Sequence, residues 1–272
     1  MKRFIASGLI LAVCSLCLGL GQAQAGPVLD RVRQAGMLRV GITTDNPPLT
    51  FISRQGEPMG YEVDLARLAA AAMGVKLELT TMHFDQLMPA LNAGEVDIVI
   101  GAVTMTPQRN ASFMLVGPYL VTGQSILTTQ RLLGQMQEEF DHQAPELVIA
   151  ASRGTTSAET VKELFPKARL VEVSDQEAGL KALLERQVDA LVADHNFCVV
   201  ATLRFRQQGL ATLDKPFTME PLGVVFTEDA LLYNWVENFL LIMRNTGRSD
   251  VLKKKWLESP AWLAELPPDK VL

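Results

Sequence analysis

The sequence predicts an α/β protein made of two similar βαβ-type lobes that are joined by a two-strand hinge. Strand-like and helix-like patterns alternate along the chain, which is typical of parallel sheets covered by helices. Two near-continuous apolar runs, at 96–100 and 188–192, suit strands that are buried on both faces. The order of elements around the first run recurs around the second, and Val96-Asp97 reappears as Val188-Asp189 at an offset of 92 residues.

The first lobe is expected to cover residues 26–121. Its clearest helix has Asp64 as the predicted N-cap, apolar residues at helical spacing after it, and Gly74 as the C-cap. The expected elements, in order, are a helix at 29–36, a strand at 38–42, a loop at 43–50, a helix at 65–73, a strand at 75–82, a helix from 84 to Gly94 and a strand at 96–100.

The second lobe is expected to cover residues 122–222, and residues 223–272 are expected to return to the first lobe. The strand-like segment at 221–226 belongs to neither copy of the repeat, so it most simply packs back on the first lobe. Two strands then cross between the lobes and form a hinge. The expected elements of the second lobe are a strand at 147–151, a turn at 154–157 that leads into a helix ending near Phe165, a strand at 170–173, a helix capped by Ser174 and a strand at 188–192.

The N-terminal residues have the pattern of a secretory leader. Lys2 and Arg3 precede an apolar run at 5–20 and the small-x-small pattern of Ala23-Gln24-Ala25. We expect cleavage after Ala25 and export to the periplasm, because the apolar run is too short for a good membrane span. Residues 11–14 resemble a lipoprotein box, but Val13 stands where Gly or Ala is expected, which favours free secretion over lipid anchoring.

Composition excludes several classes of function. The formal net charge of −5 falls to −7 once the two basic residues of the leader are removed, so nothing favours nucleic acid. Cys198 is the one cysteine after the leader, which excludes an intrachain disulfide. The sequence has no phosphate loop, nucleophile elbow or His-Glu-x-x-His motif, and its histidines are far apart. We expect no cofactor and no metal.

Four segments are expected to meet at one cleft. In open α/β sheets, ligands bind beyond the carboxyl ends of the strands. In this chain those ends are 43–48 and 101–104 in the first lobe, and 152–156 and 193–195 in the second. If the lobes face each other, these segments line one cleft between them.

Arg109 is the most informative residue near these segments. Thr106-Pro107-Gln108-Arg109 reads as the N-cap and the first three positions of a helix. A cation at the third position opposes the helix dipole, so Arg109 is either an anion-binding residue or a solvated surface arginine. The spacing leaves both alternatives open.

The other candidates have equally ordinary alternatives. Thr156 stands at a helix start, where free N–H groups attract anions, or it forms a capping box with Glu159. Asp194 could hold an ammonium group or N-cap the next helix. Phe84 could stack on a ligand, although its spacing with neighbouring leucines favours core packing, and Thr104 could donate a hydroxyl or close a turn.

The chain resembles the periplasmic solute-binding proteins of polar amino-acid ABC importers, the family 3 type, over essentially all of the sequence after the leader. The resemblance implies a type II periplasmic-binding-protein fold whose lobes close over a small ligand. The matching segments are 38–42, 60–65, 84–109, 117–119, 154–156, 188–190, Asp194 and Trp256, of which 96–109 is the most specific.

The resemblance also implies roles for individual residues. Arg109 corresponds to the arginine that clamps the ligand α-carboxylate, and Asp194 to the aspartate that holds the α-ammonium group. Phe84 corresponds to an aromatic residue that stacks on the ligand side chain. The assisting groups are the backbone at Thr156, the hydroxyl and amide of Thr104 and the main chain at Ala102. The resemblance further implies that an ABC permease in the inner membrane binds the closed form.

The first loop departs from the family pattern. Many relatives carry an aspartate and then an aromatic residue where this chain has Thr43 and Asn46, so one carboxylate and one ring are missing. Asp45 lies two residues late and is not expected to reach the ligand. Arg153 and His195 are expected beside the ligand side chain, which suggests an acidic or polar ligand.

Two functions are consistent with these residues. The first is a non-catalytic, monomeric receptor that binds an amino-acid-like solute in the periplasm. The alternative is a periplasmic cyclohexadienyl dehydratase, an enzyme class that resembles these receptors and donates a proton from a Glu shortly after the residue corresponding to Asp194. This chain has Phe197 there, which cannot deliver a proton, although His195 could substitute. We therefore expect the receptor and no catalytic residues.

Overall fold

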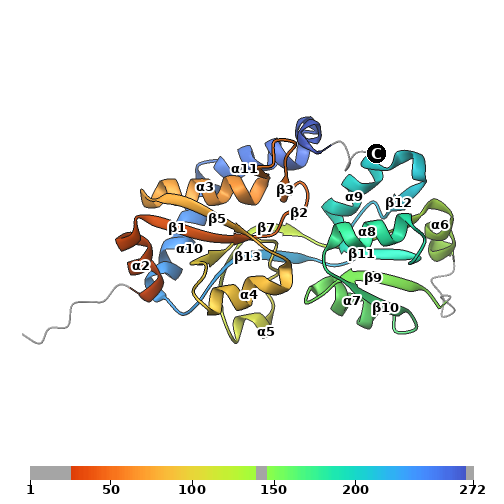
Figure 1. Ribbon diagram of the computed structural model, residues 1–272, viewed down its shortest axis with the longest axis horizontal. Coiled ribbons are helices and arrows are strands. Elements are labelled where there is room, and N and C mark those ends of the chain that lie inside the picture. Colours follow the sequence, from red (N-terminus) through yellow and green to blue (C-terminus); the bar gives the residue numbers. More distant parts are fainter. Residues whose placement is uncertain (1–25, 139–145, 268–272) are drawn as a thin grey trace, which may run out of the picture.

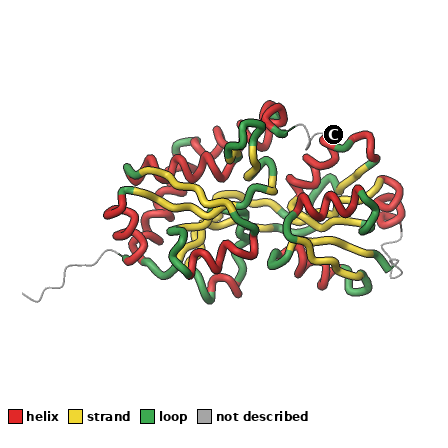
Figure 2. Tube along the Cα trace, in the orientation of Figure 1, coloured by secondary structure: helices red, strands yellow, loops and turns green. Residues whose placement is uncertain are grey.

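The computed structural model describes residues 26–138 and 146–267, and it shows two lobes side by side, each with its own sheet (Figure 1). Helices lie on both sides of the strands in each lobe (Figure 2). The predicted leader and its cleavage site lie outside the described residues. Within the described ranges, no helix has both the length and the apolar character that a membrane span requires.

The sheet of the first lobe has the order β5-β1-β6-β13-β7. Strand β1 pairs in parallel with β5 and β6, whereas β13 pairs antiparallel with β6 and β7. The carboxyl ends of the parallel strands therefore meet at one edge. The strands are β1 (Met37–Ile42), β5 (Lys76–Thr81), β6 (Ile98–Val99), β7 (Met114–Thr122) and β13 (Glu220–Phe226).

The sheet of the second lobe has the order β10-β9-β11-β8-β12, with β9 parallel to β10 and β11 and with β8 antiparallel to its neighbours. The three parallel strands have the same relative order in both lobes, which confirms the predicted α/β fold of two similar units. The strands are β8 (Gln124–Thr129), β9 (Val148–Ser152), β10 (Arg169–Val173), β11 (Ala190–Asp194) and β12 (Leu210–Thr212).

Helix α3 (Tyr61–Met73) of the first lobe begins earlier than predicted. Gly60, not Asp64, is its N-cap residue, with φ 135°, and a Cβ there would lie 2.1 Å from the carbonyl oxygen of Leu49. Asp64 instead accepts hydrogen bonds from Lys255 Nζ (2.6 Å) and Trp256 Nε1 (2.9 Å). The predicted C-cap, Gly74, is present in the left-handed conformation.

The remaining helices of the first lobe come from its N-terminal part and from the C-terminal part of the chain. Helices α2 and α10 are linked by the buried Asp229, which caps α10 through Leu232 N and accepts from the first N–H groups of α2. These helices are α2 (Pro27–Ala35), α4 (Phe84–Asn92), α5 (Pro107–Asn110), α10 (Ala230–Asn245), α11 (Arg248–Lys253), η3 (Lys254–Glu258) and η4 (Ala261–Glu265).

In the second lobe two helix caps differ by one residue from the prediction. Thr155, not Thr156, caps α7 (Thr156–Leu164) by accepting from Ala158 N, and Asp175, not Ser174, caps α8 (Gln176–Leu184) by accepting from Ala178 N. The first change leaves Thr156 free of any capping role. The other helices are α6 (Gln130–Glu138), α9 (His195–Arg204) and η2 (Arg206–Gln208).

The chain crosses between the lobes twice. It passes from β7 to β8 at Gly123 and returns from β12 into β13, where Glu220 pairs with Thr122. A Cβ at Gly123 would lie 2.2 Å from the carbonyl oxygen of Thr218, so this crossing is tightly packed. The predicted lobe boundaries at 121/122 and 222/223 fall inside β7 and β13, and we retain that division of the chain as a proposal.

The segment predicted as a loop at 43–50 contains a strand. Strand β2 (Asp45–Asn46) pairs with β3 (Thr50–Ile52), which pairs with β4 (Pro58–Met59), in a small antiparallel sheet. Phe51 of this sheet packs against Trp256 and Trp262, with ring centroids 6.0 and 5.5 Å away. The C-terminal residues therefore hold the small sheet against the first lobe and fix the position of β2.

Candidate ligand-binding cleft

A cavity lies between the two lobes at the carboxyl ends of the parallel strands. It holds roughly 450 Å³ of space that no atom fills, part of it open to solvent. All four segments that the sequence predicted for the cleft contribute to it. The lining residues are Thr43, Asp45, Asn46, Phe84, Gly101, Ala102, Thr104, Gln124, Ser152, Thr155, Thr156, Ser157, Gln176 and Asp194.

Arg109 lies beside this cavity and touches both lobes. The short helix α5 has the predicted cap, with Thr106 Oγ1 accepting from Arg109 N at 3.2 Å. The guanidinium group donates from Nη1 to Thr104 O (2.9 Å) in the first lobe and from Nη2 to Gly154 O (3.2 Å) in the second. It also stacks over the Phe84 ring, with Cζ 5.3 Å from the centroid. Burial lowers the pKa of Arg109 from its ordinary value.

This placement bears on the two alternatives for Arg109. Its guanidinium group is partly buried and contacts carbonyl oxygens of both lobes, which favours an anion-binding residue over a fully solvated surface arginine. A guanidinium carries five N–H donors, so two contacts to carbonyl oxygens leave donors for a bidentate anion. The residues it touches, Thr104 and Phe84, line the cavity.

Asp194 ends strand β11 in the second lobe and lines the same cavity. It stands at the N-cap position of α9, yet its side chain makes no capping hydrogen bond. Instead, Oδ2 accepts from Nδ2 of Asn46 in the first lobe at 2.7 Å. Burial raises the pKa of Asp194 to about 7, and this hydrogen bond from Asn46 partly opposes the shift. A partly buried carboxylate of this kind is suited to a cationic group.

A second set of contacts between the lobes consists of hydroxyl and amide groups. Thr104 Oγ1 of the first lobe is 3.4 Å from Thr156 Oγ1 of the second. Gln124 donates from Nε2 to Thr156 Oγ1 (3.2 Å) and accepts from Ser157 Oγ at Oε1 (2.5 Å). Thr156 begins the nine-residue helix α7, whose first N–H groups have no intrahelical acceptor, as at any helix start.

Phe84 packs in the core and also faces the cavity. It is half-buried and packs against the apolar cluster that contains Leu87 and Leu91. It also lines the cavity beneath the Arg109 guanidinium group. The first residue of α4 can therefore present one ring face to a ligand.

Ala102 lines the cavity in an unusual backbone conformation, with φ 53°. Its N–H donates to Glu62 Oε1 at 2.7 Å, and Glu62 Oε1 also accepts from the Tyr119 hydroxyl. Glu62 is fully buried, and its Oε2 has no hydrogen-bond partner among the described residues. Burial raises the pKa of Glu62 to about 7, against the opposing hydrogen bonds from Tyr119 and Ala102. Glu62 thus fixes the cavity wall at Ala102.

The first loop differs from expectation at Asp45. Thr43, Asp45 and Asn46 all line the cavity, and Thr43 Oγ1 lies 3.2 Å from Thr50 Oγ1. Asp45, which was not expected to reach the ligand, lines the cavity from strand β2. Its Oδ2 accepts from Gln176 N in the second lobe at 3.0 Å, and burial raises its pKa.

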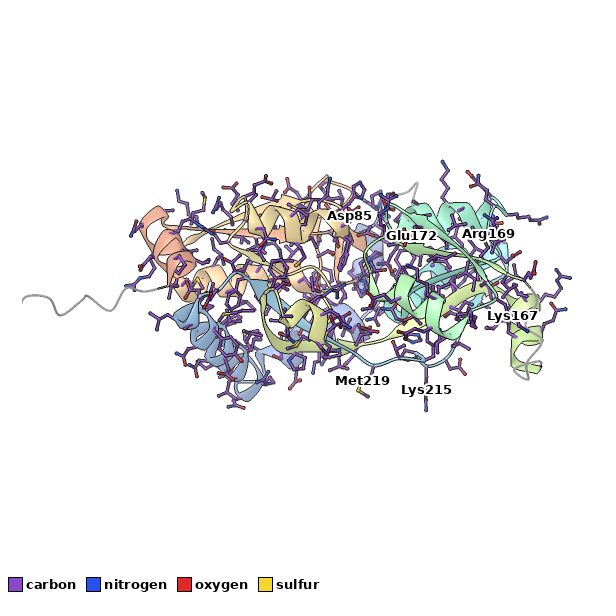
Figure 3. The ribbon with its side chains drawn as sticks, turned by 90° about the horizontal axis from the view of Figure 1, so that it is seen from below. Asp85, Lys167, Arg169, Glu172, Lys215 and Met219 are labelled. Carbon is purple, nitrogen blue, oxygen red and sulfur yellow. The ribbon has the colours of Figure 1, made fainter. Side chains whose placement is uncertain are left out.

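Arg153 and His195 are not among the residues that line the cavity. The half-exposed Arg153 pairs with Asp85 across the cleft at 3.6 Å, and Asp85 lies at the end of the first lobe that faces the second (Figure 3). His195 has a buried Nδ1 without a partner among the described residues, and burial lowers its pKa. The two side chains from which an acidic ligand was expected therefore do not line this cavity.

Sequence reasoning missed three residues that help to build the cavity. Asp45 was in a segment expected at the cleft, so its place in the sequence could have indicated that it lines the cavity. Glu62 and Gln124 gave no such signal, because their partners lie 40 residues and more than 30 residues away in the sequence. Within the described ranges, no group of three or more His, Cys, Asp or Glu side chains is arranged to hold a metal ion.

Comparison with known proteins gives consistent results along most of the chain. The family model described as "Bacterial extracellular solute-binding proteins, family 3" matches residues 38–259. A glutamine-binding protein of an ABC transporter from Bacillus subtilis is 26% identical over 262 residues, which cover 93% of this chain and 94% of that protein. Cyclohexadienyl dehydratase from Pseudomonas aeruginosa is 23% identical over 235 residues, which cover 85% of this chain and 86% of that enzyme.

Among solved structures, an ancestral amino acid-binding protein described as a precursor of cyclohexadienyl dehydratase has a TM-score of 0.75 and 32% identity. The match covers 84% of this chain and 98% of that one. Both receptors and an enzyme are thus among the similar proteins.

Proposed function

The chain belongs to the bacterial extracellular solute-binding proteins, family 3, and on that premise we propose that it binds a small amino acid between its lobes and delivers it to an ABC importer. The proposal places the protein on the outer side of the inner membrane. Its finer parts are cleavage of the leader after Ala25 and a monomeric state. The similar glutamine-binding protein and the ancestral amino acid-binding protein support the class of ligand.

One observation carries this proposal. Arg109 from the first lobe and Asp194 from the second lie at the same interlobe cavity. An α-amino acid has one carboxylate and one ammonium group, and these two side chains are the complementary pair. A bidentate arginine contact and a partly buried carboxylate are each suited to one of those groups.

Lobe closure is the proposed signal to the importer. Four hydrogen-bonded contacts already join the lobes around the cavity: Asn46 to Asp194, Gln176 to Asp45, Arg109 to Gly154 and Thr104 to Thr156. A ligand that contacts both lobes shifts the equilibrium towards the closed form by its difference in affinity for the two forms. No chemical step is needed for this function.

A thermal-shift screen of refolded protein tests the proposal. Refolding removes any ligand that survives purification, and the panel contains the common amino acids, dicarboxylates, prephenate and arogenate. A ligand that binds the native state alone raises the Tm with its concentration. A rise with an amino acid, lost in the Arg109→Ala variant, supports the proposal. A panel in which no amino acid raises the Tm contradicts it.

A dehydratase is the second candidate, because of the similar enzyme and because of Asp194. A carboxyl group with a pKa of about 7 suits a general acid at neutral pH. Phe197, in the place of the expected Glu, is fully buried in the core of the second lobe. Turnover of prephenate or arogenate by the purified protein, lost in Asp194→Asn, would establish this candidate and replace the receptor.

A further inference from the structure

The charges around the cavity are unequal. Two carboxyl groups, those of Asp45 and Asp194, line it, and the buried Glu220 lies near enough to Asp194 to raise its pKa. None of the lining residues is a lysine, arginine or histidine, and Arg109 borders the cavity. An α-amino acid backbone would match Arg109 with its carboxylate and Asp194 with its ammonium group. Asp45 would still have no cationic partner.

Asp45 is held firmly at this place. It belongs to β2, which is paired with β3, and its Oδ2 accepts the first N–H of α8 from Gln176. Within the described ranges, no lysine, arginine or histidine forms an ion pair with it. A carboxylate that is removed from water without a cation is costly, so a ligand that supplies a cation gains from meeting it.

Asn46 gives an independent indication that the ligand donates hydrogen bonds. Its side chain is 2% exposed and lines the cavity. Nδ2 is used by the carboxylate of Asp194, which fixes the orientation of the amide, and Oδ1 is buried without a partner among the described residues. Ser152 Oγ, also at the cavity, has no partner among the described residues either, and a hydroxyl can accept or donate. Unmatched buried acceptors require donors.

We propose that the ligand is a dibasic amino acid whose side-chain cation lies against Asp45 and donates to the Oδ1 atom of Asn46. This inference rests on the proposed function, in which Arg109 and Asp194 hold the α-carboxylate and the α-ammonium group. An acidic ligand is excluded by the same arrangement, because its side-chain carboxylate would meet Asp45 and Asp194 with no cation to offset the repulsion.

Matched ligand pairs test the side-chain charge in the wild-type protein. Isothermal titration compares lysine with norleucine and arginine with citrulline, pairs that are similar in shape but differ in side-chain charge. We expect each cationic member to bind at least tenfold more tightly than its neutral partner. Equal or tighter binding of norleucine and citrulline would overturn the inference, and this comparison needs no variant.

The variant Asp45→Asn then tests the residue. We expect it to lose at least tenfold of the preference for lysine over norleucine and for arginine over citrulline. Asp85→Asn is the matched control, because it removes a carboxylate at the rim of the cleft, and it should keep the full preference (Figure 3). Circular dichroism checks that both variants are folded. An unchanged preference in folded Asp45→Asn would overturn the assignment to Asp45.

Failure of this inference is distinguishable from failure of the proposed function. Binding of a neutral amino acid as tightly as or more tightly than the dibasic ones, lost in Arg109→Ala, would leave the receptor proposal intact and remove the dibasic ligand. Binding that survives in Arg109→Ala would contradict the receptor site itself.

Discussion

The Nδ2 atom of Asn46 donates a 2.7 Å hydrogen bond to Oδ2 of Asp194, although the two residues are 148 positions apart and lie in different lobes. The bond explains why Asp194 does not cap α9 even though it occupies the N-cap position. It also means that one oxygen of the proposed ammonium site is already bound by an amide of the opposite lobe. Ligand binding and lobe closure are therefore expected to depend on the same carboxylate.

Replacing Arg109 by alanine should abolish ligand binding and leave the fold intact. Charge-assisted hydrogen bonds contribute about 1.5–3 kcal/mol each, so we expect a loss of affinity of roughly 100-fold or more. Titration calorimetry measures the affinity and circular dichroism the fold. Arg153→Ala is the control, because this half-exposed arginine pairs with Asp85 outside the cavity lining and its removal should change affinity less than threefold. Wild-type affinity in Arg109→Ala would refute the carboxylate clamp.

Replacing Asp194 by asparagine should weaken amino acids more than the matching 2-hydroxy acids, which lack the ammonium group. We also expect a pH dependence in the wild type. Without ligand the pKa of Asp194 is about 7, and an ammonium group favours the carboxylate form, so affinity should fall about tenfold from pH 8 to pH 6. The variant should lack this fall. Equal losses for amines and hydroxy acids would argue against an ammonium site.

Glu62 should make the ligand-free protein less stable as the pH rises. Its pKa is about 7 in the folded chain against an ordinary value of 4.5, so between these values the folded state binds more protons than the unfolded state. Stability then falls as the pH increases across this window. Glu62→Gln should keep the hydrogen bond from Ala102 and reduce the slope. Urea unfolding at pH 5, 6, 7 and 8 measures it, and an identical slope in the variant would contradict the assignment.

Gly123→Ala should destabilise the hinge. The added Cβ would lie 2.2 Å from Thr218 O and 2.6 Å from the Pro216 Cβ, so the two crossing strands would have to separate. Overpacking of this kind costs about 1–3 kcal/mol, which urea unfolding can detect. Gly134→Ala is the matched control, because no atom lies within 4 Å of its added Cβ, and it should be neutral or stabilising. Equal stability of the two variants would show that the crossing tolerates a side chain.

The sequence by itself determined the features that depend on neighbours along the chain. Alternation of strand-like and helix-like apolar patterns predicted the two α/β units. Glycine readily adopts a positive φ, and Gly74 ends α3 as predicted. The cap from Thr106 to Arg109 spans three residues, so spacing alone was enough to place Arg109 at a helix start. The family resemblance then directed attention to Asp194, which the structure places at the cavity.

The tertiary structure decided which of these side chains meet. Asp45 enters the cavity because β2 is held by a small sheet that packs against Trp256 and Trp262, more than 200 residues away. Asp64 caps no helix because Lys255 and Trp256 reach it from the other end of the chain. Such contacts arise when distant segments are packed together, and the energy of packing outweighs the local preferences that a sequence pattern records. The sequence thus determined which chemical groups are present, and the packing of the two lobes determined which of them line the same cavity.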